Sequence, residues 1–575
     1  MKPTIILSTL VLLLIFSVSC KQNTSTFKGY NVEKTAISSK AMVVSAHPLA
    51  TKAGIEILEK GGNAVDAAIA VQLALAVVYP NAGNLGGGGF MVLRDKDGNV
   101  KTLDYREKAP LSADRDMYLD SLGNVIKDKN VDGHLAVGVP GTVAGLFESM
   151  QYAKLDFKEL IAPAIELAEK GFYITEQQAS SLNAKMPDFK RLNTTMPVFV
   201  KEAGWKKNEL MIQQDLAETL KRIRDNGKAG FYEGETADLF VKEMKAGGGI
   251  ITKEDLKKYN AKWREPITFN YKNYEIHSMP PASSGGVCLA QMLGMVENYP
   301  LSEYGFQSTE AVHLMVEAER RAYADRSEHL GDVDFYNVPL KRLTDEDYLK
   351  SRMENFDANK ASDSEIIKAG MMPESEETTH LSVVDADGNA VSITTTLNLS
   401  YGSKVVVSGA GFVLNNEMDD FSAKPGVPNS FGLVGNEANA IQPEKRMLSS
   451  MTPTIVEKEG KLFMVVGTPG GSTIITSVYQ SFLNVVEFGM TMSESVQARR
   501  FHHQWLPNTV FYEKADSVSM AKAAFTTEQI KALEAKGHIM KERGNIGRVD
   551  AILVREDGTF EGAADTRGDD HAEGI

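Results

Sequence analysis

This chain has few residues that could form covalent or metal cross-links. Only 2 of its 575 residues are cysteine and 10 are histidine. Two cysteines cannot make a disulfide framework, and no Cys-x-x-Cys or His-Glu-x-x-His spacing occurs. The adjacent His502 and His503 would point apart on a regular element, so we expect them to be structural. The sequence therefore predicts a protein that needs no metal ion and no other cofactor.

Basic residues are also in the minority. Lys and Arg number 62 against 76 Asp and Glu, which gives a formal net charge of -14. Nucleic-acid binding needs a basic surface, so this balance argues against it. A hydrophobic content of 43% with 24% charged residues is ordinary for a folded protein, and the length is too great for one small core.

Long apolar runs are missing except at residues 5–18, which are too few to span a membrane as a helix. Lys2 precedes this run and Ser17-Val18-Ser19-Cys20 closes it. This order is typical of a bacterial lipoprotein signal. We expect residues 1–20 to be the signal, Cys20 to carry lipid, residues 21–40 to be a linker, and the protein to lie in the periplasm or cell envelope. The alternative is an ordinary cleaved signal peptide with an incidental cysteine; with Cys20 lipidated, Cys288 has no partner.

A break in composition lies about two thirds of the way along the chain. A polar, acidic segment ends at Glu376-Glu377, and runs of Val, Ile and Thr follow Thr378. Residues 380–384 and 390–397 flank the turn Asp-Ala-Asp-Gly-Asn and predict a hairpin, and residues 405–414 predict a further strand. We predict cleavage between Glu377 and Thr378. The freed threonine would be a nucleophile with its own base, because an α-amine has a pKa of about 7.7–8.0.

Several other segments favour a layered α/β or α+β protein. Residues 63–78 predict a buried helix, and the glycines at 86–89 indicate backbone that approaches another segment too closely for side chains. A hairpin over residues 91–105 would place Arg106 at a strand end. The charged helix over residues 317–328 predicts a solvated or internally ion-paired face. Gly470-Gly471 at the start of a helix could supply backbone N–H groups to an oxyanion.

Short motifs follow one another in a fixed order along nearly the whole chain. They occupy residues 61–68, 84–90, 105–107, 280–286, 378–380, 414–421, 448–451 and 467–471. In this order they resemble the γ-glutamyltransferases (γ-glutamyl transpeptidases), a family of N-terminal nucleophile hydrolases. The resemblance runs from about Met42 to Asp565. It is specific because the motifs occur together, since each alone is weak.

The resemblance implies an α+β fold, a four-layer αββα sandwich. It also implies self-cleavage into a large fragment, residues 41–377, and a small fragment, residues 378–575, which stay together as a heterodimer. It assigns a role to each matching residue: Thr378 as nucleophile, Thr396 orienting it, Gly470 and Gly471 as the oxyanion hole, Arg106, Ser449 and Ser450 for the substrate α-carboxylate, and Asn398, Glu417 and Asp420 for its α-amino group.

The expected substrates are glutathione and related γ-glutamyl compounds, and the acceptors are water, amino acids or dipeptides. Residues 425–435 match a lid found over the γ-glutamyl site in many members, with Phe431 where a tyrosine is common. An apolar cover there suits small substrates and shields the acyl-enzyme from water. The alternatives are a relative acting on acylated β-lactam side chains or on poly-γ-glutamate, and a lipoprotein that binds γ-glutamyl peptides without turnover.

Overall fold

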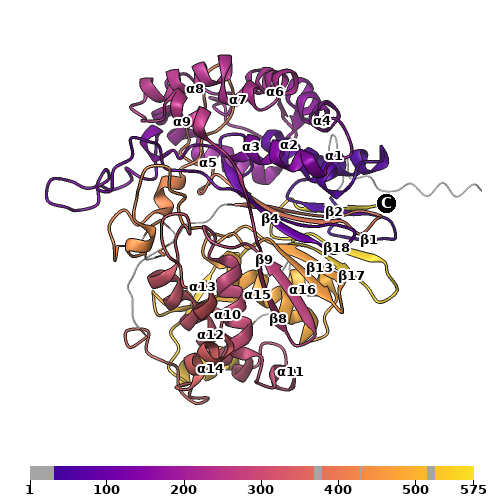
Figure 1. Cartoon of the computed structure of the whole chain (residues 1–575), viewed down its shortest axis with the longest axis vertical. Helices are drawn as coiled ribbons and strands as arrows, with labels where there is room; N and C mark the ends of the chain where they lie inside the picture. The colour runs from indigo at the N-terminus through magenta and orange to yellow at the C-terminus, as the bar shows by residue number, and fades with distance from the viewer. Residues whose placement is uncertain (1–31, 368–377, 428, 431, 434, 514–524) are drawn as a thin grey trace, which may run out of the picture.

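Two seven-stranded sheets lie face to face between two layers of helices (Figure 1). The computed structural model describes residues 32–367, 378–427, 429–430, 432–433, 435–513 and 525–575. The α+β class and the αββα order of layers predicted from the sequence are confirmed.

The first sheet contains the hairpin that follows Thr378, and the second strand of this hairpin is the central strand of the sheet. All neighbouring strands in it are antiparallel. Their order is β19 (His571–Gly574), β2 (Met42–Ser45), β10 (Thr379–Val384), β11 (Ala390–Thr396), β3 (Gly88–Arg94), β4 (Val100–Tyr105) and β7 (Lys262–Arg264).

The second sheet is likewise antiparallel throughout. Its order is β1 (Thr35–Ser38), β18 (Phe560–Ala563), β17 (Asp550–Val554), β13 (Lys461–Gly467), β12 (Thr454–Lys458), β9 (Tyr274–Ser278) and β8 (Ile267–Tyr271). Two small sheets lie apart from it: β14 (Phe501–His502), β15 (Val510–Glu513) and β16 (Met540–Arg543), and β5 (Phe172–Tyr173) with β6 (Leu210–Met211).

Every residue of β10 and β11 is buried, because these strands are covered on both faces. One face meets the second sheet through an apolar cluster that includes Val44, Val384, Ile455 and Ile552. The other face lies under the first helical layer. Burial on both faces explains why these strands are continuous runs of Val, Ile and Thr instead of alternating polar and apolar residues.

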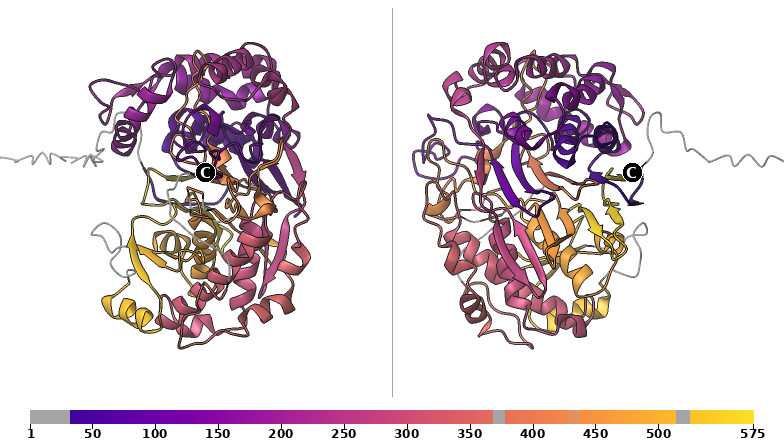
Figure 2. Two further views of the ribbon diagram at one scale, coloured as in Figure 1. Left: turned by 90° about the vertical axis from the view of Figure 1, so that its left-hand side faces the viewer. Right: turned by 45° about the vertical axis from the view of Figure 1, so that its right-hand side comes forward.

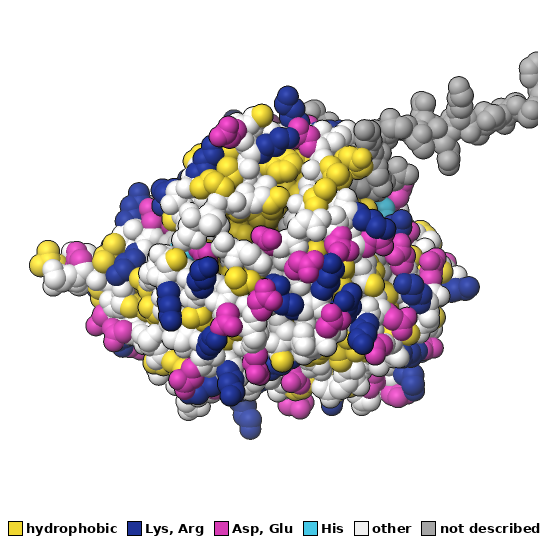
Figure 3. Space-filling view, turned by 90° about the horizontal axis from the view of Figure 1, so that it is seen from above, with side chains coloured by type: hydrophobic (Ala, Val, Ile, Leu, Met, Phe, Trp, Pro, Cys, Tyr) yellow, Lys and Arg dark blue, Asp and Glu magenta, His cyan; other side chains and the backbone are white. Residues whose placement is uncertain are grey.

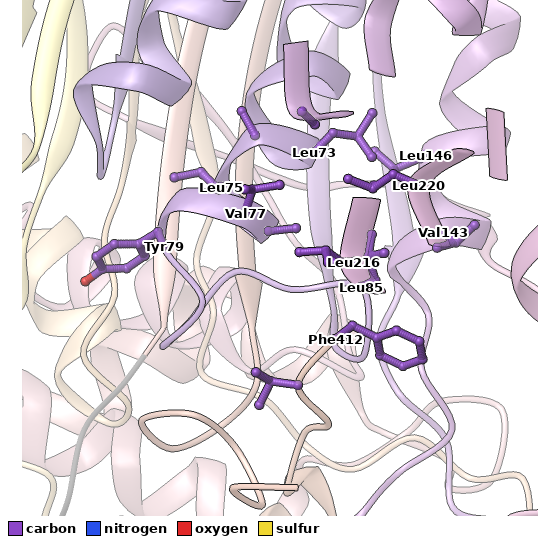
Figure 4. Close-up of a cluster of buried hydrophobic side chains, with 14 of the residues drawn as sticks. Leu73, Leu75, Val77, Tyr79, Leu85, Val143, Leu146, Leu216, Leu220 and Phe412 are labelled. Atoms are coloured by element: carbon purple, nitrogen blue, oxygen red, sulfur yellow. The ribbon is translucent and has the colours of Figure 1, made fainter. Parts of the chain in front are cut away.

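The first helical layer is centred on α2 (Ala64–Val78), all 15 residues of which are buried. Asn63 caps it and exchanges hydrogen bonds with Asp66, as a capping box does. Figure 4 shows Leu73 of α2 close to Leu146 and Leu220 of neighbouring helices. The layer also contains α1 (Pro48–Glu59), α3 (Thr142–Ser149), α4 (Phe157–Lys170), α5 (Glu176–Leu192), α6 (Gln214–Asn226), α7 (Ala229–Tyr232), α8 (Gly234–Ala246) and α9 (Lys253–Lys258). Seen from above in Figure 3, its surface mixes basic, acidic and apolar side chains.

The second helical layer covers the other sheet and contains α10 (Gly285–Val296), α11 (Leu301–Tyr304), α12 (Thr309–His329), α13 (Leu340–Leu343), α14 (Glu346–Met353), α15 (Thr473–Val486), α16 (Met492–Gln497) and α17 (Thr527–Ala535). In α12 the charged residues are not solvated. Arg320 and Arg321 are each 1% exposed and both pair with Glu317. The ion-paired alternative is therefore the correct one for this helix.

Two expectations change in the structure. Residues 405–414 do not form a strand; Val406 makes one isolated bridge to Val413, because left-handed Gly409 and Gly411 fold the segment back on itself. Thr35–Ser38, assigned to the linker, forms β1 and pairs with β18. Within the described ranges, no helix is both long and apolar enough to cross a bilayer.

Each sheet combines strands from before and after Thr378 (Figure 2). In the first sheet β2 lies between β19 and β10, and β11 pairs with β3. In the second, β1 pairs with β18, and β12 pairs with β9. Both parts of the chain are therefore needed to complete either sheet.

Candidate active site

The register of the first sheet brings three of the predicted site residues to the same end of its strands. Thr379 pairs with Thr395, so Thr378 and Thr396 lie at neighbouring strand ends. Thr396 pairs in turn with Gly88, and Gly89 pairs with Tyr105. Arg106 directly follows Tyr105. It therefore lies at the same end of the sheet, after β4, which is two strands away from β11.

The second sheet delivers two further segments to this place. In its register Thr454 pairs with Val466. The loop before β12, with Ser449 and Ser450, and the turn after β13, with Gly470 and Gly471, therefore lie at the same end of the sheet. The active-site candidates come from loops at one end of both sheets.

These segments enclose a pocket of about 20 Å³, room for about one water molecule. Nine of the ten predicted catalytic and substrate-binding residues line it: Arg106, Thr378, Thr396, Asn398, Glu417, Asp420, Ser449, Ser450 and Gly471. The tenth, Gly470, lies with Thr378 in an adjoining cavity. Glu377, Phe431 and Cys20 are outside the described residues. A γ-glutamyl group can enter only if some of these side chains move apart.

The glycine run explains how the strands come so close. A Cβ on Gly87 would lie 2.1 Å from the backbone oxygen of Thr396, and one on Gly86 would lie 2.2 Å from that of Val413. Real Cβ atoms do not approach oxygen so closely. The prediction that these glycines allow a close backbone approach is confirmed, and the segment that Gly87 approaches carries Thr396.

Arg106 is buried among three carboxyl groups. Its side chain is 1% exposed and lies 2.6 Å from Glu417, 3.8 Å from Glu107 and in a short ion pair with Asp420. Burial raises the pKa of Glu107 to about 8 and that of Glu417 well above its ordinary value. The Asp420 side chain is 11% exposed against 0% for the other two, so we assign the negative charge to Asp420.

This arrangement suits a zwitterion. The resemblance assigned Arg106 to a carboxylate and Glu417 and Asp420 to an ammonium; the structure shows these groups bound to one another. The α-carboxylate and α-ammonium of an amino acid can replace this internal ion pair charge for charge.

Asn398 offers an additional acceptor. It has a left-handed backbone with φ 75, and its Nδ2 donates to the backbone oxygen of Asn416 at 3.0 Å. Its Oδ1 is buried and has no hydrogen-bond partner among the residues described. An unpartnered buried oxygen beside two carboxyl groups fits an incoming ammonium.

The serine pair is held by a residue that the sequence did not single out. Arg326 of α12 donates from Nη2 to Ser450 Oγ at 3.1 Å and from Nε to Ser284 Oγ at 2.9 Å. Ser284 Oγ donates to the backbone oxygen of Ser449 at 2.6 Å. Arg326 therefore positions both serines. No local signal distinguishes it from the other arginines of its helix.

The turn before α15 has the geometry of an oxyanion site. Gly470 and Gly471 have φ 138 and 53, values that favour glycine. Neither N–H donates a backbone hydrogen bond to another described residue. Both lie at the positive end of the α15 dipole, where a developing negative charge is stabilised.

No neighbouring histidine is placed to activate Thr378. Burial lowers the pKa of His380 to about 3, which keeps its ring neutral. Its two nitrogens are bonded to Thr394 Oγ at 2.9 Å and Ser382 Oγ at 3.0 Å. His502 and His503 are buried with lowered pKa values as well. These described histidines are therefore poorly suited to act as a base for Thr378.

Two clusters elsewhere have metal-ligand spacing but poor chemistry for a cation. His313 and His538 lie near Glu317, which two arginines already neutralise. Glu275 and His277 lie near Glu457, whose carboxylate is 2.5 Å from Arg94. A metal ion would have to displace or oppose these guanidinium groups.

Comparison with known proteins agrees with the family that the sequence motifs resemble. The sequence model described as gamma-glutamyltranspeptidase matches residues 50–575. The chain belongs to this family. It is 46% identical over 548 residues to a glutathione hydrolase proenzyme of Escherichia coli (strain K12), covering 94% of this chain and 93% of that protein.

Solved structures of the γ-glutamyltranspeptidase family and of an acylase are also similar. The Helicobacter pylori γ-glutamyltranspeptidase chain is 44% identical, with a TM-score of 0.55, covering 60% of this chain and 97% of that one. A cephalosporin acylase from Bacillus halodurans is 26% identical, with a TM-score of 0.80, covering 96% of this chain and all (100%) of that one.

Proposed function

We propose that this γ-glutamyltranspeptidase cleaves itself before Thr378 and then transfers the γ-glutamyl group of glutathione and related compounds to water, amino acids or dipeptides. The observation that carries the proposal is the convergence of Thr378, a zwitterion-binding set around Arg106 and the Gly470-Gly471 turn on one small pocket. Nucleophile, substrate anchor and oxyanion donors are the parts that acyl transfer requires.

The residues divide the chemistry between them. Arg106 with Ser449 and Ser450 would bind the α-carboxylate, and Asn398, Glu417 and Asp420 the α-ammonium. The γ-carbonyl is thereby presented to Thr378 Oγ, while the Thr378 α-amine accepts the hydroxyl proton. Gly470 and Gly471 stabilise the oxyanion, and loss of one such donor typically costs about 3 kcal/mol. Thr396 lies at the neighbouring strand end and orients the nucleophile.

The same proposal covers processing and location. Cleavage would give a heterodimer of residues 41–377 and 378–575. A lipid on Cys20 would hold the enzyme in the cell envelope after removal of the signal, and residues 425–435 would close over the substrate. If Cys20→Ala leaves the membrane-bound share of the protein unchanged, the anchor is refuted.

Replacing the nucleophile tests the main proposal. Thr378→Ala is expected to give one full-length band on a denaturing gel and no release of anilide from a γ-glutamyl anilide. The matched control is Thr379→Val, because the buried Oγ1 of Thr379 has no described hydrogen-bond partner. The control should yield two bands and stay active. An active, uncleaved wild-type chain would refute the mechanism.

An acylase is the second candidate, because the cephalosporin acylase shares the fold. A glutaryl anilide has the same chain as a γ-glutamyl anilide but no α-amino group. The buried Oδ1 of Asn398 and the carboxylate of Asp420 would then lack a partner, so we expect the glutaryl compound to react at least tenfold more slowly. Equal rates would favour the acylase.

A further inference from the structure

Four exposed apolar side chains lie close together on the segment between α5 and α6. Met196, Val198, Leu210 and Ile212 are 59%, 41%, 43% and 39% exposed, and we call them the apolar patch. Three of them, Met196, Val198 and Ile212, line one hollow of about 260 Å³. A Cβ on Gly171 would lie 2.7 Å from the Ile212 side chain and 3.1 Å from that of Leu210, so Leu210 adjoins the other three. Adjoining exposed apolar side chains are typical of a surface that meets a partner or a membrane.

A second hollow, which we call the lysine hollow, adjoins the patch. It measures about 370 Å³ and lies between α1 and α4. Its charged lining residues are three lysines and two glutamates: Lys52, Lys60, Lys170, Glu56 and Glu166. Gly171 lines it as well, and so connects it to Leu210 and Ile212. A lysine stem can pack on apolar surface while its ammonium group stays in water, which suits the boundary between lipid tails and headgroups.

The chain enters the fold on the same side of the molecule. The Glu33 N–H donates to His571 Nδ1 at 2.7 Å, and Thr51 Oγ1 of α1 donates to the backbone oxygen of His571 at 3.2 Å. Thr51 precedes Lys52, which lines the lysine hollow. Figure 1 shows α1, α4 and β1 on one side of the molecule. Residue 33 is therefore close to the helix that forms one wall of the lysine hollow.

This position decides which face an anchor at Cys20 can hold against a membrane. The chain from Cys20 to Glu33 spans at most about 45 Å when fully extended. A folded chain of 575 residues is about 60 Å across. A bilayer that holds the lipid is therefore within easy reach of the side that carries α1 and α4, whereas the opposite side of the molecule is out of reach.

We infer that the apolar patch inserts into the surface of the lipid bilayer that holds Cys20, with the lysine hollow at the level of the headgroups. The inference rests on the lipid anchor of the proposed function. A lipid alone tethers a protein without orienting it, whereas a second contact through the folded domain strengthens the attachment and fixes one face. The patch and the lysine hollow provide that contact beside the point where the chain leaves the fold.

Thiol labelling of the anchored enzyme tests the docking. Met196→Cys and Ile539→Cys form a matched pair, because Met196 is 59% exposed and Ile539 58%, and Ile539 lines neither hollow. Cys288 is buried and should not react. On isolated membrane fragments, a water-soluble maleimide should label Met196→Cys at least about fivefold more slowly than Ile539→Cys, because lipid excludes the reagent from an inserted side chain. Equal rates on the membrane-bound enzyme would overturn the inference.

The same two variants, exported with an ordinary cleavable signal and therefore without lipid, give the reference. In that protein both thiols should react at equal rates. Slow labelling of Met196→Cys already in the lipid-free protein would mean that a second copy of the chain covers the patch, and would also overturn the inference. An enzyme that has Cys20 but stays in the soluble fraction refutes the anchor and the docking together. Release of anilide from a γ-glutamyl anilide tests the catalytic proposal separately.

A charge placed in the patch provides a second arm. Ile212→Glu should raise the labelling rate of Met196→Cys on membranes about threefold or more, because a carboxylate resists transfer into lipid. The control is Leu122→Glu, since Leu122 is 84% exposed and lines neither hollow. Both variants should keep the wild-type rate of anilide release, which shows that they are folded. The inference is overturned if Ile212→Glu changes the labelling no more than its control does.

Discussion

Removing Arg106 should cost stability and catalysis for separable reasons. In Arg106→Gln the carboxylate of Asp420 loses its buried partner. At pH 7 the folded protein then has a lower free energy if Asp420 takes up a proton. Burial already raises the pKa of Asp420 above its ordinary value in the wild-type protein, which makes this protonation easier. Removing one member of a buried ion pair typically costs about 3–5 kcal/mol, and we expect a loss of that order. Adding Asp420→Asn removes the charge and should restore most of the stability.

Catalysis should not return with stability. Neither variant offers a cation to the substrate α-carboxylate, so kcat/KM for a γ-glutamyl anilide should fall about tenfold to 100-fold or more in both. The free energy of unfolding is measured with urea on uncleaved Thr378→Ala chains, so that a single polypeptide unfolds. Arg115→Gln is the control, because its pair with Glu437 is exposed and worth at most about 1 kcal/mol. A double variant no more stable than Arg106→Gln, or a single variant with normal kcat/KM, would refute this account.

Two further outcomes follow from packing and titration. Gly87→Ala should give insoluble or uncleaved protein, because its Cβ would meet the Thr396 oxygen at 2.1 Å, whereas Gly544→Ala, with no atom within 4 Å of its Cβ, should process normally on a denaturing gel. Burial, with the adjacent Asp420, raises the pKa of Asp419 to about 7, so the stability it contributes is present below its ordinary 3.8 and is lost as the pH rises through 7. Asp419→Asn should therefore gain stability over wild type in urea titrations as the pH increases from 4 to 8, and a difference independent of pH would contradict the assignment.

The local sequence pattern predicts the helices and strands that carry the site. It does not predict the residues that hold the site side chains in place. The hairpin after Thr378 has a turn sequence between two runs of Val, Ile and Thr, and the helix over residues 64–78 begins at a clear capping residue, so both elements could be predicted from the sequence. Arg326 could not be identified, because its role depends on Ser450, which reaches it from another part of the chain.

One prediction was wrong and another left two alternatives open, each for a physical reason. Residues 405–414 have the composition of a strand, but positive φ angles at Gly409 and Gly411 break it, and no nearest-neighbour pattern reveals them. The charged helix α12 is buried because Arg320 and Arg321 both pair with Glu317 within it and also bond to polar groups of other segments. Composition gives the charges of a helix but not whether they compensate one another.

Each sheet pairs strands from both parts of the chain, and this makes cleavage a one-way step in folding. Before the cut, β2 and β10 find each other within one polypeptide; after it, the same pairing would require two separate chains to meet and thread their strands between one another. The mature enzyme should therefore last because it unfolds slowly, and not because it can refold. Its lifetime depends on the activation barrier to unfolding, in which the hydrogen bonds between these strands are broken. Fragments separated by denaturant and then mixed should regain little activity, however gently the denaturant is removed.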